Sequence, residues 1–265
     1  MVQDKIVVIT GGASGIGAAI GEKFGKLGAR IALMDFDRQT LKKTEKRFIE
    51  NGIKVLALKC DVTDPAQCAA SVSRIIKKWG GIDILVNNAG ITQRSLFRNT
   101  RLEVYRRIMD VNFFGTLHST KPALESLIAR KGVIVVTTSI AGIAPLMGRT
   151  GYSASKHALH GFFESLRTEL ADYGVHVMML CPYFTVTNLQ DRALNGEGKP
   201  NREVRSLVGK QATVESVADA VYRGVMKRKP ILVLTFMGKL SYFMSRLFPR
   251  FYEKKMSEKI RPEFF

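Results

Sequence analysis

Short apolar runs alternate with longer amphipathic segments along almost the whole chain. Seven runs have the length and composition of strands, namely 5–10, 30–35, 53–60, 82–87, 132–138, 174–181 and 230–235. Six segments repeat apolar residues at helical spacing, near 15–28, 37–51, 64–79, 100–129, 150–173 and 213–228. Several of the strand-like runs are continuously apolar, as in a parallel sheet covered on both faces. The alternation predicts an α/β fold with a single doubly wound parallel sheet and helices on both faces.

The same pattern predicts how the chain is organised. No internal repeat, low-complexity block or linker interrupts residues 1–235, which we expect to form one domain. The longest stretch without a pattern is 183–210, and it follows the C-terminal end of an expected strand. Because ligands bind at that edge of such sheets, we expect a substrate lid there; a disordered loop is the alternative. Residues 236–265 are expected to add a basic, amphipathic helical extension.

The composition indicates in which cellular compartment the protein resides and which kinds of partner it binds. A chain of 265 residues with 46% apolar content can bury one sizeable core. Cys60, Cys68 and Cys181 are scattered and lack CxxC spacing, which favours a reducing compartment. No signal-like apolar stretch precedes 5–10, so we expect a cytoplasmic protein. The net charge of +18 indicates an anionic partner: cofactor phosphates, nucleic acid or an acidic membrane surface.

The first expected strand leads directly into TGGASGIG at 10–17, which then opens a helix. Gly11 permits a sharp turn, Gly15 lets the backbone approach a diphosphate, and Gly17 allows close packing of helix and strand. The helix presents its N-terminal amides and the positive end of its dipole to the phosphates. This context predicts a Rossmann-type dinucleotide site.

An acidic residue, Asp35, ends the second expected strand. Its carboxylate can accept hydrogen bonds from the adenosine ribose hydroxyls and would repel a 2′-phosphate, which favours NAD over NADP. Arg38, Lys42 and Lys43 lie close by and could soften that exclusion, so NADP remains possible. Their alternative role is that of solvated charges on a surface helix.

Residues 152–156, YSASK, place Tyr152 and Lys156 four residues apart on an expected helix. That spacing puts both side chains on one face. A lysine cation beside a phenol favours the phenolate, so we expect a lowered tyrosine pKa and a group able to exchange protons nearer neutral pH. An ordinary surface pair is the alternative.

Taken in order, TGGASGIG, NNAG (87–90), Ser139 and YSASK closely resemble the motifs of the short-chain dehydrogenase/reductase family. The resemblance extends from residue 5 to about residue 235. Within the family, QRSLF at 93–97 and VYRRIMDVNFFGT at 104–116 are similar to the retinol- and steroid-type reductases.

The resemblance implies a catalytic set. Tyr152 would exchange a proton with the substrate oxygen while a hydride moves to or from the nicotinamide. Lys156 would hold the nicotinamide ribose and lower the tyrosine pKa, and Ser139 would hydrogen-bond the reacting oxygen. Asn112 matches the asparagine that holds a water in the family's proton relay; in a purely structural role it would satisfy a helix backbone, as Ser139 would cap a strand.

Further cofactor contacts follow from the resemblance. They are Ser14 and Ile16 in the phosphate loop, Asp61 and Val62 facing the adenine, Asn88, Ala89 and Gly90 beside the adenosine ribose, and Pro182, Thr185 and Thr187 after the sixth strand. Tyr183 stands where the family usually has glycine, which is expected to alter that turn. A metal is not expected, since His157 and His160 have no accompanying ligand set.

Basic residues concentrate near the C-terminus, with eleven Lys and Arg against three Glu between residues 223 and 263. An apolar helical stripe is interleaved with them: Phe236, Met237, Leu240, Phe243, Met244, Leu247 and Phe248. No uninterrupted apolar run approaches the ~20 residues of a spanning helix. The stripe is expected either to pack on protein, the domain or a partner subunit, or to dock on an anionic membrane.

The leading hypothesis is an NAD-dependent oxidoreductase acting on an apolar secondary alcohol or ketone of steroid, retinoid or lipid type, assembled as a homodimer or homotetramer. The alternatives are an NADPH-dependent carbonyl or 3-oxoacyl reductase and a non-catalytic NAD-responsive binding protein. The intact Ser/Tyr/Lys set argues against the last. Nucleic-acid binding is not expected, because the basic tail offers neither aromatic platforms nor a recognition helix.

Overall fold

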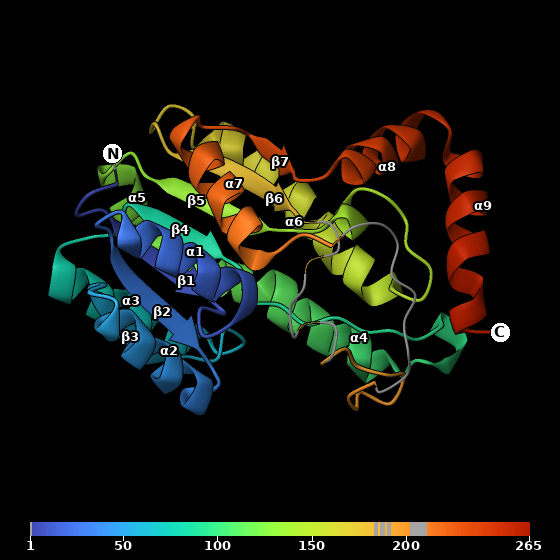
Figure 1. Cartoon of the computed structure of the whole chain (residues 1–265), viewed down its shortest axis with the longest axis horizontal. Helices are drawn as coiled ribbons and strands as arrows, with labels where there is room; N and C mark the ends of the chain where they lie inside the picture. Colours follow the sequence, from blue (N-terminus) through green and yellow to red (C-terminus); the bar gives the residue numbers. More distant parts are fainter. Residues whose placement is uncertain (1, 183–184, 186–188, 190–191, 202–210) are drawn as a thin grey trace.

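A seven-stranded, entirely parallel sheet forms the centre of the molecule in a computed structural model that describes residues 2–182, 185, 189, 192–201 and 211–265 (Figure 1). The strand order is β3-β2-β1-β4-β5-β6-β7. The strands are β1 (Ile6–Thr10), β2 (Arg30–Asp35), β3 (Val55–Lys59), β4 (Ile84–Asn87), β5 (Val133–Thr137), β6 (His176–Cys181) and β7 (Ile231–Val233). The predicted doubly wound fold is confirmed, and each strand lies within its predicted run.

Helices cover both faces of the sheet. One face carries α3 (Pro65–Trp79), α5 (Gly115–Ala129) and α6 (Thr150–Glu169). The other carries α1 (Gly15–Lys26), α2 (Arg38–Glu50) and α7 (Val214–Met226). The remaining helices are α4 (Leu102–Met109), α8 (Phe236–Leu247) and α9 (Pro249–Ile260).

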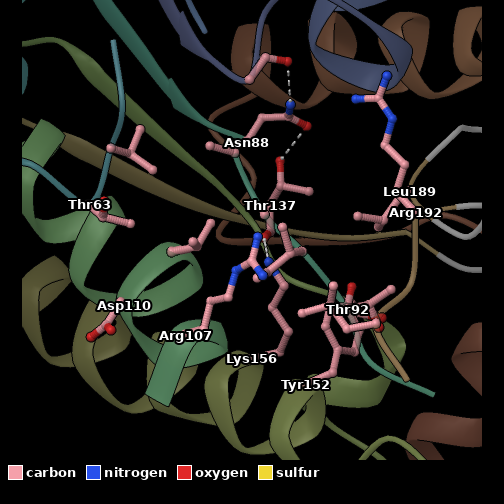
Figure 2. Close-up of a pocket in the computed structure, with 18 of the residues that line it drawn as sticks. Thr63, Asn88, Thr92, Arg107, Asp110, Thr137, Tyr152, Lys156, Leu189 and Arg192 are labelled. Carbon is pink, nitrogen blue, oxygen red and sulfur yellow. Dashed lines mark hydrogen bonds between the residues drawn. The ribbon is translucent and has the colours of Figure 1, made fainter. Parts of the chain in front are cut away.

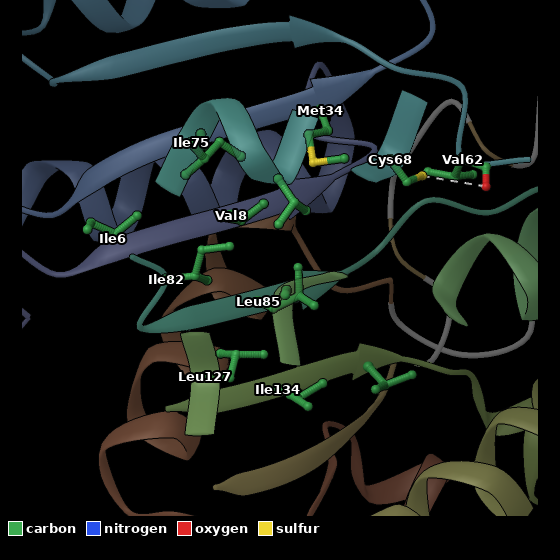
Figure 3. Close-up of a cluster of buried hydrophobic side chains, with 14 of the residues drawn as sticks. Ile6, Val8, Met34, Val62, Cys68, Ile75, Ile82, Leu85, Leu127 and Ile134 are labelled. Carbon is green, nitrogen blue, oxygen red and sulfur yellow. Dashed lines mark hydrogen bonds between the residues drawn. The ribbon is translucent and has the colours of Figure 1, made fainter. Parts of the chain in front are cut away.

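Strand periodicity divides the buried side chains into two layers. Along β1, Ile6 and Val8 join the layer under α3, α5 and α6, while Val7 and Ile9 join the opposite layer. Figure 3 shows the first layer, in which Ile75 from α3 and Leu127 from α5 lie over the strands. Continuously apolar strands are therefore needed, because both faces of the sheet are buried.

Local capping explains where several helices begin. The Asp37 carboxylate accepts hydrogen bonds from the amides of Gln39 and Thr40 and starts α2. Asp64 caps α3 in the same way, ahead of Pro65 at the first helical position. These side chains satisfy amides that have no partner inside the helix.

One predicted helix differs from the structure. The single helix expected at 100–129 is divided by a π-helical turn, Asp110–Phe114, between α4 and α5. The expected C-terminal helical extension is confirmed and consists of α8 and α9; Pro249, which lacks an amide hydrogen, stands in the first turn of α9, where it is tolerated. Much of the expected lid at 183–210 lies outside the described residues; of its described residues, which are 185, 189 and 192–201, Leu194 pairs with the segment after β4. In the part of the chain that the structure covers, no helix combines the length and apolarity needed to span a membrane.

Candidate active site

A cleft of about 1120 Å³ opens at the carboxyl ends of the central strands. Most of the predicted site residues line it: Gly11, Ser14, Gly15, Ile16, Asp35, Asp61, Val62, Asn88, Ala89, Gly90, Ser139, Tyr152, Lys156, Pro182 and Thr185. Gly17 and Asn112 lie behind its wall rather than in its lining. Thr187 and Tyr183 fall outside the described residues. The structure therefore brings together residues that are spread over most of the sequence.

The glycine turn after β1 forms one end of the cleft. Gly11 has φ +61° and Gly15 has φ +54°, backbone conformations that L side chains rarely adopt. A Cβ on Gly17 would overlap the carbonyl oxygen of Gly11, so glycine is required for this close approach. In the described structure the side chain of Ser14 makes no capping hydrogen bond to α1. The first turn of α1 is thus available to an anion.

Asp35 lies beside this turn at the end of β2. Its carboxylate oxygens accept hydrogen bonds from the amides of Ala13 and Asp37, each at 3.0 Å. Burial raises the pKa of Asp35, and these two amides oppose the shift. The carboxylate is held rigidly at the position where an adenosine ribose is expected.

The NNAG turn is tied directly to the glycine turn. Thr10 Oγ1 accepts hydrogen bonds from the amides of Asn88 at 3.0 Å and Ala89 at 3.1 Å. The Asn88 side-chain amide donates to the carbonyls of Thr10 and Gly11, both at 3.2 Å, and its oxygen faces Thr137 (Figure 2). The two turns are therefore locked together as one wall.

Tyr152 and Lys156 project from α6 into the cleft one helical turn apart (Figure 2). The Lys156 Nζ donates a 2.8 Å hydrogen bond to the carbonyl of Thr137 and lies 5.6 Å from the centroid of the Tyr152 ring. Ser139 follows β5, and its hydroxyl also accepts a 3.1 Å hydrogen bond from the amide of Ala141. The serine thus caps a short turn and faces the cleft as well.

The prediction of a lowered tyrosine pKa is wrong for this structure. Burial raises the pKa of Tyr152, and only a hydrogen bond with Ser139 and the charge of Arg149 act in the opposite direction. Burial also lowers the pKa of Lys156 to about 8. Desolvation disfavours the charged form of both groups and sets the direction of both pKa shifts.

Asn112 sits in the π-helical turn and is fully buried. Its side-chain oxygen accepts from the Ile91 amide at 2.8 Å, and its Nδ2 donates to the Ile91 carbonyl at 3.0 Å and to Ser155 Oγ at 2.9 Å. The side chain joins the segment after β4 to the helix that carries Tyr152. The relay role of Asn112 stays a prediction.

Two residues beside Tyr152 were not among the predicted site residues, although Gln93 begins the QRSLF stretch that carries part of the resemblance. The Gln93 side-chain oxygen accepts a 2.9 Å hydrogen bond from the Tyr152 amide. Arg149 Nη1 donates to Thr92 Oγ1 at 2.9 Å and to the Gln93 carbonyl at 3.0 Å. Both residues are buried, and together they hold the first turn of α6.

The two histidines of α6 serve local contacts. His157 Nδ1 lies 2.9 Å from the Ser153 carbonyl, and His160 Nδ1 lies 2.9 Å from a Glu164 carboxylate oxygen. Among the residues that the structure describes, no three metal-binding side chains come together.

Comparisons with known proteins agree on one family. The family model for short chain dehydrogenase matches residues 5–198. Human dehydrogenase/reductase SDR family member 7 is 42% identical over 200 residues, covering 73% of this chain and 59% of that protein, so the match spans less than two thirds of the human relative. The Xenopus tropicalis member 7B is 33% identical over 269 residues, covering 98% of this chain and 87% of that protein. A short-chain dehydrogenase/reductase from Burkholderia phymatum, solved with NAD, superposes with a TM-score of 0.83 at 25% identity and covers 96% of both chains.

The lowered pKa of Lys156 predicts how dinucleotide binding depends on pH. Below about pH 8 the amine is charged in the free protein, and from its expected place at the nicotinamide ribose it should attract the anionic dinucleotide; above that pH the charge is lost. Affinity for NADH should therefore be flat below pH 8 and weaken as the pH rises further. Fluorescence titrations between pH 6.5 and 9.5 measure this. Lys156→Met should flatten the profile, whereas Lys42→Met, on exposed α2 surface, should keep it; a flat wild-type profile contradicts the assignment.

Proposed function

The chain belongs to the short-chain dehydrogenase family, and we propose that within it the protein is an NAD-dependent oxidoreductase of an apolar secondary alcohol or ketone. The observation that carries this proposal is the convergence of Ser139, Tyr152 and Lys156 on the cleft that also contains the glycine turn and Asp35. Binding and chemistry are thereby placed in one continuous space, as a hydride transfer requires.

The residues present fit a dinucleotide. The first turn of α1 and the glycine turn suit a diphosphate, and Asp35 suits the adenosine ribose hydroxyls. We propose that Lys156, which lines the same cleft, holds the nicotinamide ribose. When bound, the nicotinamide supplies a hydride acceptor or donor.

In the proposed mechanism, Tyr152 Oη exchanges a proton with the substrate oxygen. Ser139 Oγ donates a hydrogen bond to that oxygen and stabilises the negative charge that develops there. Lys156, which is charged below about pH 8, favours the tyrosinate. Asn112 and Gln93 hold the backbone on either side of these groups in place.

The apolar part of the cleft lining supports an apolar substrate of steroid, retinoid or lipid type. It includes Ile140, Leu146, Leu189, Leu194 and Pro200. Arg192 also lines the cleft, and its charge acts on Asp35. This guanidinium is the observation that favours the second candidate, an NADPH-dependent carbonyl or 3-oxoacyl reductase, because it would attract a 2′-phosphate.

Tyr152→Phe tests the mechanism. The substitution keeps the ring and removes the exchangeable proton, so turnover should fall by about 10²–10⁴-fold while NADH binding survives. A screen of sterols, retinoids, long-chain alcohols and acyl thioesters, followed by NADH fluorescence, supplies the substrate for the measurement. Near-wild-type turnover in the purified variant would exclude Tyr152 as the acid/base.

Asp35→Asn tests the choice of cofactor. Asparagine keeps the shape of the side chain and removes its charge. The wild-type preference for NADH over NADPH should therefore fall by roughly tenfold or more, the change in affinity expected when a hydrogen bond to a charged group is lost. Side-by-side titrations of both cofactors measure the ratio. If wild-type protein binds NADPH more tightly, the second candidate replaces the first.

We also propose peripheral docking of α8 on an anionic membrane. Gly238, Tyr242 and Ser245 face the domain: Gly238 is buried, Tyr242 packs near Ile140 and Ser245 hydrogen-bonds the Ile143 carbonyl at 3.3 Å. The predicted stripe lies on the opposite side of the helix, where Leu240, Phe243 and Leu247 are 41%, 58% and 68% exposed. Leu240, Phe243 and Leu247 are therefore left largely uncovered by the part of the domain that the structure describes. Basic residues flank it: Lys239, Arg246, Arg250, Lys254 and Lys255.

Docking predicts co-sedimentation with liposomes that contain phosphatidylserine, partly reversed by salt. Each large side chain contributes about 1.5–3 kcal/mol on burial, so Phe243→Ser with Leu247→Ser should reduce partitioning by ~100-fold or more. Ile49→Ser, an exposed position on α2, is the matched control. Wild-type protein that never co-sediments, but changes its oligomeric state in the double variant, would assign the face to a second subunit instead.

A further inference from the structure

The end of the chain returns to the catalytic side of the molecule. After α8 leads away from the sheet, α9 brings the C-terminus back toward the segment that precedes α4 (Figure 1). We call residues 261–265, RPEFF, the C-terminal clasp. It contacts two segments that flank Tyr152: the loop after β4 and the turn that leads into α6.

A buried ion pair forms the first of these contacts. Glu263 Oε2 lies 3.8 Å from Arg94 Nη1, and the two side chains are 9% and 5% exposed. Charges removed from water interact more strongly than surface pairs, and breaking one partner leaves the other uncompensated. The clasp is thus anchored to the loop after β4.

A close aromatic contact forms the second. Gly148 has φ +71°, and a Cβ there would overlap the ring of Phe264. The ring therefore rests directly on the backbone of the turn, one residue before Arg149. Phe265 differs: it is 67% exposed, and its ring contacts the guanidinium groups of Arg98 and Arg261.

Both contacted segments hold the first turn of α6. Within the described residues, α6 has no side-chain cap of its own at Arg149. Instead, the Tyr152 amide donates a hydrogen bond to the Gln93 side chain. Arg149 donates to Thr92 and to the Gln93 carbonyl. The Gly148 carbonyl accepts a hydrogen bond from the Ser95 amide at 3.0 Å. Tertiary contacts replace the usual N-cap, so whatever fixes these segments also fixes Tyr152.

We infer that the C-terminal clasp positions Tyr152 for proton transfer, with Glu263 and Phe264 as positioning residues. The inference rests on the proposed acid/base role of Tyr152. Two routes lead from the clasp to the first turn of α6. Phe264 rests on Gly148, which comes directly before Arg149. Glu263 pairs with Arg94, whose neighbour Gln93 binds the Tyr152 amide; we call these two routes the link. The glycine turn and Asp35 lie outside this link.

Phe264→Ala tests the positioning role. Misplacement of a catalytic group by about 1 Å can cost ~100-fold in rate, so kcat should fall at least tenfold while the Kd for NADH stays unchanged. The charge of Arg149 helps to lower the Tyr152 pKa, and the variant would displace this charge. In the pH profile of kcat for alcohol oxidation, the acid limb should therefore move to higher pH. Lys156 on the same helix and Ser139 across the cleft also face the phenol, and neither is bound to the clasp.

Matched variants complete the experiment. Phe265→Ala should behave as wild type, and Phe264→Leu should restore part of kcat. Glu263→Gln keeps the shape of the side chain and removes its charge. It should lower kcat and move the acid limb of the pH profile to higher pH, as Phe264→Ala does. This variant preserves the test if Phe264→Ala does not fold. A lower melting temperature with unchanged kcat and pH profile in these variants would overturn the inference.

A readout without turnover separates this inference from the proposed function. With ¹³Cζ-labelled tyrosine, the Tyr152 resonance is identified by its loss in Tyr152→Phe. Its chemical shift and titration should change in Phe264→Ala and not in Phe265→Ala, even if no substrate is turned over. An unchanged resonance in Phe264→Ala would contradict the link.

Discussion

The reversal of strand order between β1 and β4 is the constraint on which the site depends. The chain leaves β1 for α1 on one face, whereas the chain after β4 passes to helices on the other face. The turns at the carboxyl ends of these neighbouring strands therefore diverge and leave a cleft. Thr10 and Asn88 bridge the turns at its base, so the cleft is open toward ligand and rigid behind it.

Burial sets the electrostatics inside this cleft. It raises the pKa of Tyr152 and lowers that of Lys156 to about 8. Near neutral pH the phenol is therefore neutral and the amine is still charged, and a charged amine near the phenol favours the tyrosinate. The proton exchange that the spacing of YSASK suggests thus starts from a neutral phenol beside a charged amine.

Local patterns explain what could be predicted from the sequence. The apolar runs predicted the seven strands β1–β7 to within a few residues, because strand formation depends on residues that are neighbours in the sequence. The glycine turn and Asp35 predicted the position of the cleft for the same reason. The π-helical turn at Asp110–Phe114 was not predicted, since one extra residue hardly changes the apolar spacing. The roles of Arg149, Gln93 and the C-terminal clasp at the site were not predicted for another reason: their contacts join residues far apart in the chain. The direction of the Tyr152 pKa was wrong because burial is a tertiary property.

A crystal structure of the protein with NADH tests the central claim most directly. The account predicts the adenosine ribose on Asp35, the diphosphate at the first turn of α1, and the nicotinamide beside Ser139 and Tyr152, with Lys156 on its ribose. An adenosine bound at the Tyr152 end, or a dinucleotide bound away from the carboxyl ends of β1 and β4, would contradict it.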